Sequence, residues 1–258
     1  MINGTMVPKD KIIVILQIGH SNMAGRALGP ATEMAYFYDT DPHLWHYEKG
    51  GVWKLAKEAI YADGGTPGWP QGAGPGMALL HKALSLAPDA YIVSIGRAES
   101  LDLGASCFNH RKGGIFYDIL MDAAKELKGK VTFAGLFTML GYDGRSVPKA
   151  QNGGYLECMK GLAADVRADL EEPDLPFVPG DYERGASGGF SPTCCGAPQL
   201  IAQLAQVPGA VPHSFLIPTD GIVMQDNHHY NMVGHKMWAE RAFAGLAEGG
   251  MIPWATKK

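Results

Sequence analysis

The sequence has few cysteines and no pattern that would make them structural. Cys107, Cys158, Cys194 and Cys195 have neither the spacing of a zinc site nor the density of a disulfide scaffold. Adjacent cysteines such as Cys194 and Cys195 are more often two separate thiols than one strained disulfide. Cysteine usage therefore leaves the cellular compartment open.

Long hydrophobic runs and concentrations of positive charge are also missing. No apolar run approaches about 18 residues, and the N-terminal stretch MINGTMVPKDK lacks the apolar segment of a signal peptide, so we expect no membrane span. The net charge is -4, and lysine and arginine are scattered along the chain. These features argue against nucleic acid or an anionic membrane as a partner and favour a small substrate that is neutral or weakly charged.

Glycine and proline, by contrast, are abundant, with 34 and 17 residues respectively. They indicate many shaped loops, and loops on a rigid scaffold carry most binding and catalytic sites. No linker-like stretch and no internal repeat divides the chain. We therefore expect residues 1–258 to form a single domain.

Short apolar segments alternate with segments of helical periodicity, as buried parallel strands alternate with amphipathic helices. The predicted strands are 11–19, 90–96, 131–140, 175–182 and 213–218. The predicted helices are 76–87, 116–129, 155–172, 198–206 and 231–247. The alternation predicts an α/β fold, a flavodoxin-like three-layer α/β/α sandwich with a mostly parallel five-stranded sheet. Such a sheet binds ligands beyond the carboxyl ends of its strands.

Residues 26–74 show no periodicity and are rich in glycine, proline and aromatic residues. Loops of this length inside a compact domain are usually functional, so we expect an ordered loop system close to the site. Trp45, Trp53 and Trp69 have two interpretations: they stack on sugar faces, or they form a small core of the loops.

The stretch ILQIGHSNMAG at 15–25 ends an apolar strand with glycine and then presents His20, Ser21 and Asn22. On a structural interpretation, Ser21 caps the turn that follows the strand. On a functional interpretation, Ser21 is a nucleophile whose neighbouring backbone amides face a developing oxyanion. The second interpretation needs a histidine base and a carboxylate elsewhere in the chain.

The stretch DNHHYNMVGH near the C-terminus contains both groups. Asp226 and His229 are three residues apart, so the aspartate can fix the histidine tautomer and leave the other ring nitrogen for Ser21. Alternatively, they mark only a helix N-terminus. A metal site of His228, His229 and His235 is less well supported, because no cluster of carboxylates and no histidine pair at helical spacing accompanies them. We expect no metal and no cofactor.

The serine does not lie in a G-x-S-x-G elbow, because Met23 stands in place of the second glycine. GHSNMAG and DNHHYNMVGHKMWAERA together resemble the G-Q-S-N-M and D-x-x-H-F-N-x-x-G blocks of the SGNH hydrolase superfamily. More narrowly, they resemble the carbohydrate-esterase branch that contains sialate O-acetylesterases and acetylxylan esterases. The resemblance implies an α/β/α fold in which Ser21 is the nucleophile, His229 the base and Asp226 the residue that orients it.

The stretch GAGPGMALLHKAL at 72–84 is similar to the family's G-P-x-x-x-F-A block. This similarity implies that the Gly74 amide joins the Ser21 amide in the oxyanion hole. The chain departs from the family at a third block, where Leu140 replaces the oxyanion-hole glutamine and Tyr142 and Gly144 replace a glutamate and an aspartate. Loss of one oxyanion donor typically lowers turnover about a hundredfold to a thousandfold.

Other polar and aromatic residues are candidates for contact with the substrate. They are His20, which replaces the family's glutamine, together with Asn22, Trp69 and Asn109. The alternative is that the polar ones only satisfy local backbone groups.

We therefore predict a serine esterase that removes O-acetyl or other short acyl groups from carbohydrates. Two alternatives remain: a noncatalytic carbohydrate-binding relative, which Leu140 favours, and a hydrolase of the same fold with another acyl preference. Kinship favours a secreted or periplasmic protein.

Overall fold

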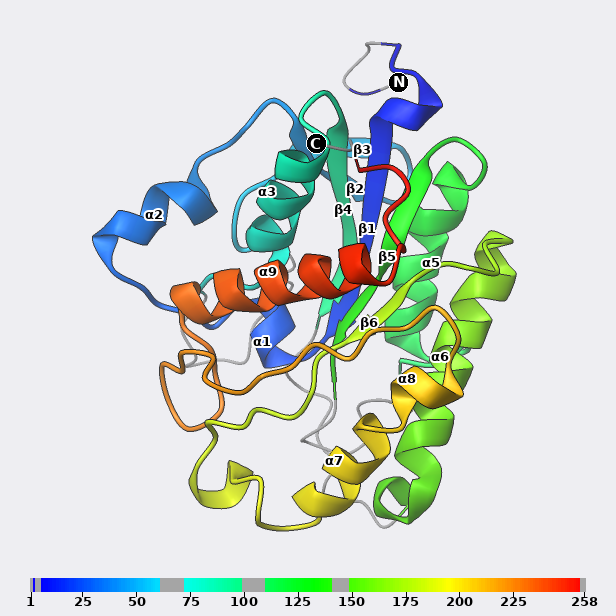
Figure 1. Cartoon of the computed structure of the whole chain (residues 1–258). Coiled ribbons are helices and arrows are strands. Elements are labelled where there is room, and N and C mark those ends of the chain that lie inside the picture. Colours follow the sequence, from blue (N-terminus) through cyan, green and yellow to red (C-terminus); the bar gives the residue numbers. More distant parts are fainter. Residues whose placement is uncertain (1, 3–5, 61–71, 99–109, 141–148, 256–258) are drawn as a thin grey trace.

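The centre of the protein, seen in a computed structural model, is a six-stranded sheet (Figure 1). The structure describes residues 2, 6–60, 72–98, 110–140 and 149–255. In sheet order the strands are β3 (Val52–Leu55), β2 (Leu44–Glu48), β4 (Tyr91–Ala98), β1 (Ile12–Gly19), β5 (Thr132–Met139) and β6 (Phe177–Pro179). All neighbouring strands are parallel except β3, which pairs antiparallel with β2.

Strand β1 lies in the middle of the sheet, and all eight of its residues are buried. A strand covered on both faces has no solvent side, which explains why its sequence is an almost continuous apolar run. Its side chains still alternate between the faces. Val14 and Leu16 belong to one hydrophobic cluster, whereas Ile13 and Ile15 belong to the other.

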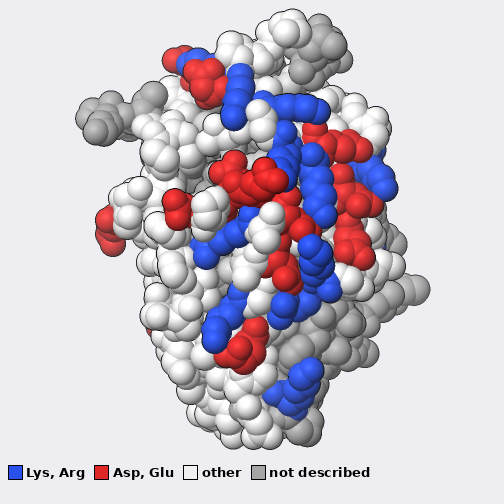
Figure 2. All heavy atoms as spheres, turned by 90° about the vertical axis from the view of Figure 1, so that its right-hand side faces the viewer, with Lys and Arg blue, Asp and Glu red and all other residues white. Residues whose placement is uncertain are grey.

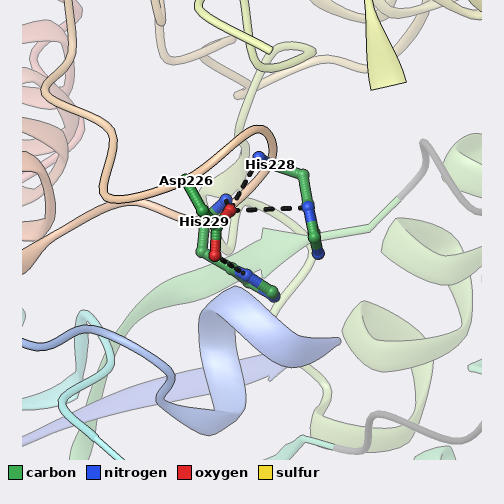
Figure 3. Close-up of side chains that lie close together, drawn as sticks. All are labelled: Asp226, His228 and His229. Carbon is green, nitrogen blue, oxygen red and sulfur yellow. Dashed lines mark hydrogen bonds and ion pairs between the residues drawn. The ribbon is translucent and has the colours of Figure 1, made fainter. Parts of the chain in front are cut away.

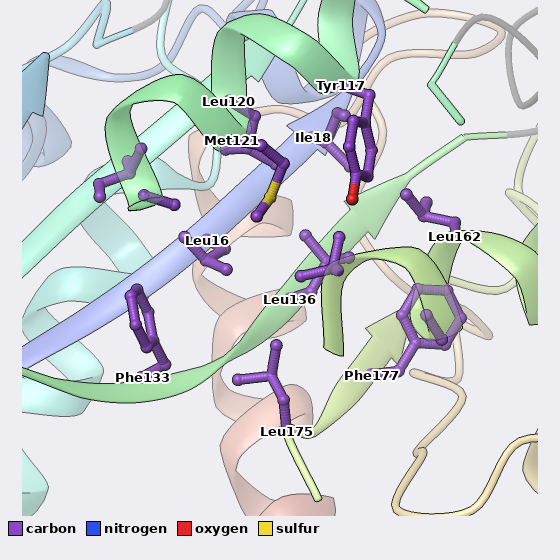
Figure 4. Packing of buried hydrophobic residues seen from close by; sticks show 14 of the residues in the cluster. Leu16, Ile18, Tyr117, Leu120, Met121, Phe133, Leu136, Leu162, Leu175 and Phe177 are labelled. Atoms are coloured by element: carbon purple, nitrogen blue, oxygen red, sulfur yellow. The ribbon is translucent and has the colours of Figure 1, made fainter. Parts of the chain in front are cut away.

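Helices cover both faces of the sheet (Figure 1). Helices α5 (Ile115–Leu127) and α6 (Tyr155–Leu170) pack on the face shown in Figure 4, and α3 (Gly76–Leu86) and α9 (Met232–Glu248) pack on the other. The remaining described helices and helical turns are η1 (Lys9–Lys11), α1 (Ser21–Ala24), α2 (Ala31–Tyr38), η3 (Ala150–Gly154), η4 (Gly188–Phe190), α7 (Ala197–Leu204) and α8 (Val207–Ala210). Within the described ranges, no helix has both the length and the apolarity needed to cross a bilayer.

The predicted three-layer α/β/α architecture is confirmed, but the strand count of five was wrong. The segment 213–218 forms only isolated bridges with β6 and its flank. Strands β2 and β3 lie inside the region predicted to be a loop system. They are short and carry polar side chains, and their connection contains Gly50 and Gly51, whose φ angles of 85° and 79° favour glycine. Such a hairpin leaves little hydrophobic periodicity in the sequence.

Two of the three tryptophans of this region belong to the core. Trp45 on β2 is 8% exposed and is part of the cluster beneath α5. Trp53 on β3 packs on Tyr47, with ring centroids 4.7 Å apart. Trp69 lies outside the described residues. For Trp45 and Trp53 the structure thus favours the interpretation as core.

The surface over α5 and α6 carries intermixed acidic and basic side chains (Figure 2). Asp169 on α6 lies within 2.5 Å of Lys112 Nζ and 2.8 Å of Lys125 Nζ, and it accepts from Tyr117 Oη at 3.0 Å. Burial raises the pKa of Asp169, but these three partners outweigh burial and lower it to about 2. Asp169 therefore stays charged and links α6 to α5 and to the segment before it.

The three cysteines in the described part of the chain are separate thiols. Cys194 and Cys195 are not joined to each other, and Cys158 is buried and free. Cys107 lies outside the described residues.

Candidate active site

Ser21 lies at the carboxyl end of β1, in the first position of helix α1. The strand ends at Gly19, where an added Cβ would come within 2.8 Å of both Met139 O on β5 and Met23 Cβ on α1. Glycine is therefore needed for the close approach of these elements. This packing places Ser21 at the edge where parallel α/β sheets bind ligands.

The structure brings Ser21 together with His229 and Asp226, which lie in the loop before α9. Ser21 Oγ lies 3.0 Å from His229 Nε2, and His229 Nδ1 lies 2.8 Å from Asp226 Oδ2. His229 is 1% exposed, so its ring has little freedom to move. Because a carboxylate only accepts hydrogen bonds, Nδ1 carries the proton and Nε2 accepts from the Ser21 hydroxyl.

The second carboxylate oxygen of Asp226 also accepts hydrogen bonds. Asp226 Oδ1 accepts from the backbone amides of His228 at 2.9 Å and His229 at 2.8 Å. Figure 3 shows the Asp226 carboxylate between the two histidines, close to helix α1. Partial burial raises the pKa of Asp226, but the hydrogen bonds from the His229 ring and the two amides outweigh it, so the pKa lies below its ordinary value. Asp226 is therefore an anion fixed in one orientation.

For a metal site, the structure brings together a different set of residues from the set predicted. His235 lies in helix α9 at 0% exposure, and the cluster that has the spacing of a metal site is Asp226, His228 and His229, whose donor atoms lie within 4.8 Å of one another. A metal ion there would take either the His229 Nδ1 atom that faces Asp226 or the Nε2 atom that faces Ser21. Metal binding at this cluster and a Ser21–His229–Asp226 relay therefore exclude each other.

Asn22 is buried and joins helix α1 to the loop before α9, which carries Asp226 and His229. Its Nδ2 donates to His228 O at 3.0 Å, and its Oδ1 accepts from the Tyr230 amide at 3.0 Å. The same Nδ2 lies 3.4 Å from Oε1 of Glu183, a side chain with 8% exposure. Asn22 was predicted as a substrate contact, and in the structure both polar atoms of its amide bond to groups of the chain itself.

Gly74 lies against helix α1, since an added Cβ would be 2.6 Å from Met23 O. Its amide donates to Glu58 Oε2 at 3.1 Å, a hydrogen bond that it would have to give up in order to make the oxyanion contact that the resemblance implies. Glu58 also accepts from the amides of Ile60 and Met77. Burial raises the pKa of Glu58, against the lowering effect of these three hydrogen bonds.

The other sequence candidates are placed as follows. His20 is 5% exposed, and its ring lies 5.4 Å from that of His110. Leu140, at the place of the family's glutamine, packs in the hydrophobic cluster beneath α5 and α6, and its carbonyl accepts from Tyr155 Oη at 2.6 Å. Asn109, Trp69, Tyr142 and Gly144 lie outside the described residues.

Sequence reasoning missed several residues of the site. Glu58 lies in the aperiodic region, where nothing distinguishes it from a surface glutamate. Glu183 follows β6 and so lies at the carboxyl edge of the sheet, which is the one signal that could have identified it. The ring of Phe190 stacks on that of His228, with centroids 4.2 Å apart and an angle of 16° between the planes.

His235 is a buried, uncharged neighbour of the site. Neither ring nitrogen has a hydrogen-bond partner among the described residues, and the ring meets that of Tyr230 edge-on at 5.7 Å. Burial, and to a smaller extent His229, lowers the pKa of His235 to about 3. The folded protein therefore holds this imidazole neutral.

We expect His235 to make the fold sensitive to mild acid. A histidine in the unfolded chain takes up a proton near pH 6.5, whereas His235 in the fold does so near 3. Between these values the unfolded chain binds more protons, so stability falls as the pH falls, by up to about 1.4 kcal/mol per pH unit. His235→Phe removes this difference. Urea unfolding measures the free energy of unfolding at each pH. A change from pH 6.5 to 4.5 should lower this free energy by about 2 to 3 kcal/mol more in the wild type than in the variant. Equal losses would contradict the assignment.

The fold and the match to a family model together define the class of protein. A mostly parallel sheet flanked by helices, with the first strand at its centre, is the α/β/α fold of the SGNH hydrolases, as predicted. Residues 11–246 match the model of the family described as carbohydrate esterase, sialic acid-specific acetylesterase, and the chain belongs to this family. A comparison with curated protein sequences finds no match.

Solved structures share the fold at low sequence identity. A protein of Arabidopsis thaliana is 20% identical, with a TM-score of 0.71, and the match covers 92% of this chain and 98% of that one. NanS is 12% identical, with a TM-score of 0.66 and coverage of 95% and 99%. A carbohydrate acetylesterase from Xanthomonas citri is 16% identical, with a TM-score of 0.60, and the match covers 91% of this chain and 55% of that one.

Proposed function

We propose that the protein is a serine esterase that removes O-acetyl or other short acyl groups from carbohydrates. The observation that carries the proposal is the continuous hydrogen-bonded chain from Ser21 through His229 to Asp226, with heavy-atom distances of 3.0 and 2.8 Å. Family membership supports an ester of a carbohydrate as the substrate.

In the proposed mechanism, Ser21 Oγ attacks the ester carbonyl and His229 Nε2 takes the serine proton. His229 then gives this proton to the sugar oxygen as the C–O bond breaks, which leaves an acyl-serine. Water, deprotonated by His229, attacks the acyl-serine and releases the acid and free Ser21. Asp226 holds the Nδ1 proton throughout and stabilises the imidazolium.

The developing oxyanion requires hydrogen-bond donors. We assign the backbone amide of Ser21 as one of these donors. The Gly74 amide joins it only by exchanging Glu58 Oε2 for the substrate oxygen, because one N–H cannot donate fully to both.

The acyl preference is tested with activated esters of increasing chain length. We expect kcat/KM to be highest for acetate and to fall as the chain grows, because polar side chains, Asn22, Glu183 and His228 among them, lie close to Ser21 and His229. Release of acetate from O-acetylated sugars then tests the leaving group. A maximum at a long acyl chain would contradict the acetyl assignment and support the alternative acyl preference.

One observation favours a second candidate, a noncatalytic carbohydrate-binding relative. Leu140 packs in the core at the position where the family has its oxyanion-hole glutamine. Binding of acetylated glycans without turnover, and without labelling of Ser21 by an organophosphonate, would support this candidate over the esterase.

A further inference from the structure

The backbone on both sides of His229 is held by a single side chain. Asn22 Nδ2 donates to the carbonyl of His228, the residue before His229, at 3.0 Å. Asn22 Oδ1 accepts from the amide of Tyr230, the residue after it, at 3.0 Å. Since Asn22 directly follows Ser21, one amide group fixes the loop of the base to the helix of the nucleophile.

The environment of Asn22 makes this contact rigid. Asn22 is 3% exposed, so water does not compete for its amide. Glu183 Oε1 lies 3.4 Å from the same Nδ2 and can only accept when ionised. The carboxylate therefore favours the orientation in which Nδ2 faces Glu183 and His228 O, while Oδ1 faces the Tyr230 amide.

We propose that Asn22 is a positioning residue that sets the place of His229 relative to Ser21, and that Glu183 fixes the orientation of the Asn22 amide. This inference rests on the proposed serine mechanism. A displacement of about 1 Å at a catalytic group is enough to lower a rate about a hundredfold, so a clamp on both neighbours of His229 has a direct effect on the chemical step.

Asparagine suits this position because it combines one donor and one acceptor on a short stem. Asn22→Asp removes the donor to His228 O and places a second carboxylate beside Glu183. Asn22→Ser adds no charge, but its single hydroxyl is too short to reach both His228 O and the Tyr230 amide. The two variants thus break the clamp in different ways.

The test separates positioning from simple structural support. For each variant, a stoichiometric organophosphonate titrates the reactive Ser21, and kcat on an activated acetate ester is divided by the titrated fraction. We expect Asn22→Ser and Asn22→Asp to lower kcat per titrated site about tenfold to a hundredfold with little change in KM. The exposed Asn152→Asp is the matched control and should retain wild-type kcat.

Glu183 provides a second readout. Glu183→Gln alone keeps a carbonyl that can accept from Asn22, so we expect only a small loss. In combination with Asn22→Asp it removes the repulsion between two carboxylates, and kcat per titrated site should recover about tenfold relative to Asn22→Asp.

The outcomes have distinct meanings. Unchanged kcat per titrated site in both Asn22 variants, even with a lower melting temperature, would overturn the positioning role. Absence of rescue by Glu183→Gln would overturn the close approach of Glu183 to the side chain at position 22, on which its part depends. If the wild type shows neither ester turnover nor covalent labelling, the proposed function fails instead, which is a different result.

Discussion

Alanine in place of Ser21 is expected to lower kcat/KM for an activated acetate ester by at least about a thousandfold. The substitution removes the oxygen that lies 3.0 Å from His229 Nε2 and leaves no other nucleophile in its place. Because Ser21 is only the first residue of a one-turn helix, the fold should tolerate the change. The measurement is hydrolysis by wild type and variant at neutral pH, with circular dichroism to compare their folding.

The matched control is Ser85→Ala. Ser85 lies exposed on helix α3 and donates to Lys82 O at 2.7 Å, away from the triad. This variant should retain wild-type activity. Full ester hydrolysis by Ser21→Ala would contradict the serine mechanism, because the reaction would then need another nucleophile.

The second large effect is expected for Asp226→Asn, with a fall in kcat of about a thousandfold to ten-thousandfold. Two backbone amides donate to Oδ1 at 2.9 and 2.8 Å, so the oxygen of the new amide should stay there. Its NH₂ group then faces His229 Nδ1 and turns that nitrogen into an acceptor. The proton moves to Nε2, where it prevents His229 from accepting the Ser21 proton.

Steady-state hydrolysis measures the loss, and ¹⁵N chemical shifts of the histidine rings report the tautomer of His229. Asp220→Asn, an exposed change in the same part of the chain, is the matched control. An active Asp226→Asn variant with Nδ1 still protonated would show that the carboxylate does not set the tautomer.

The sequence predicted the elements whose residues act locally or repeat with a clear period. The alternation of apolar and helical segments was enough to predict the layers. The two blocks that contain Ser21, Asp226 and His229 were enough to predict the residues that the structure brings together. Both depend on side-chain type and on the rule that parallel strands end at one edge of the sheet.

What the sequence could not predict depends on long-range hydrogen bonds. The Gly74 amide has the same chemistry whether it faces a substrate or the buried Glu58, and the sequence does not say which. The two-point contact of Asn22 with the loop around His229 likewise joins segments that no spacing relates. Leu140 could be identified as a departure from the family, but only the structure places its side chain in the core.

The separation of the two halves of the site has a consequence for biosynthesis. Ser21 and His229 are 208 positions apart, and the loop of His229 is held at the start of α9, which packs on α3. When the first half of the chain has emerged from the ribosome, Ser21 has been synthesised but His229 has not. Under the proposed mechanism, the chain cannot hydrolyse esters until the loop before α9 reaches Ser21, so recovery of hydrolysis during refolding reports the formation of this long-range contact.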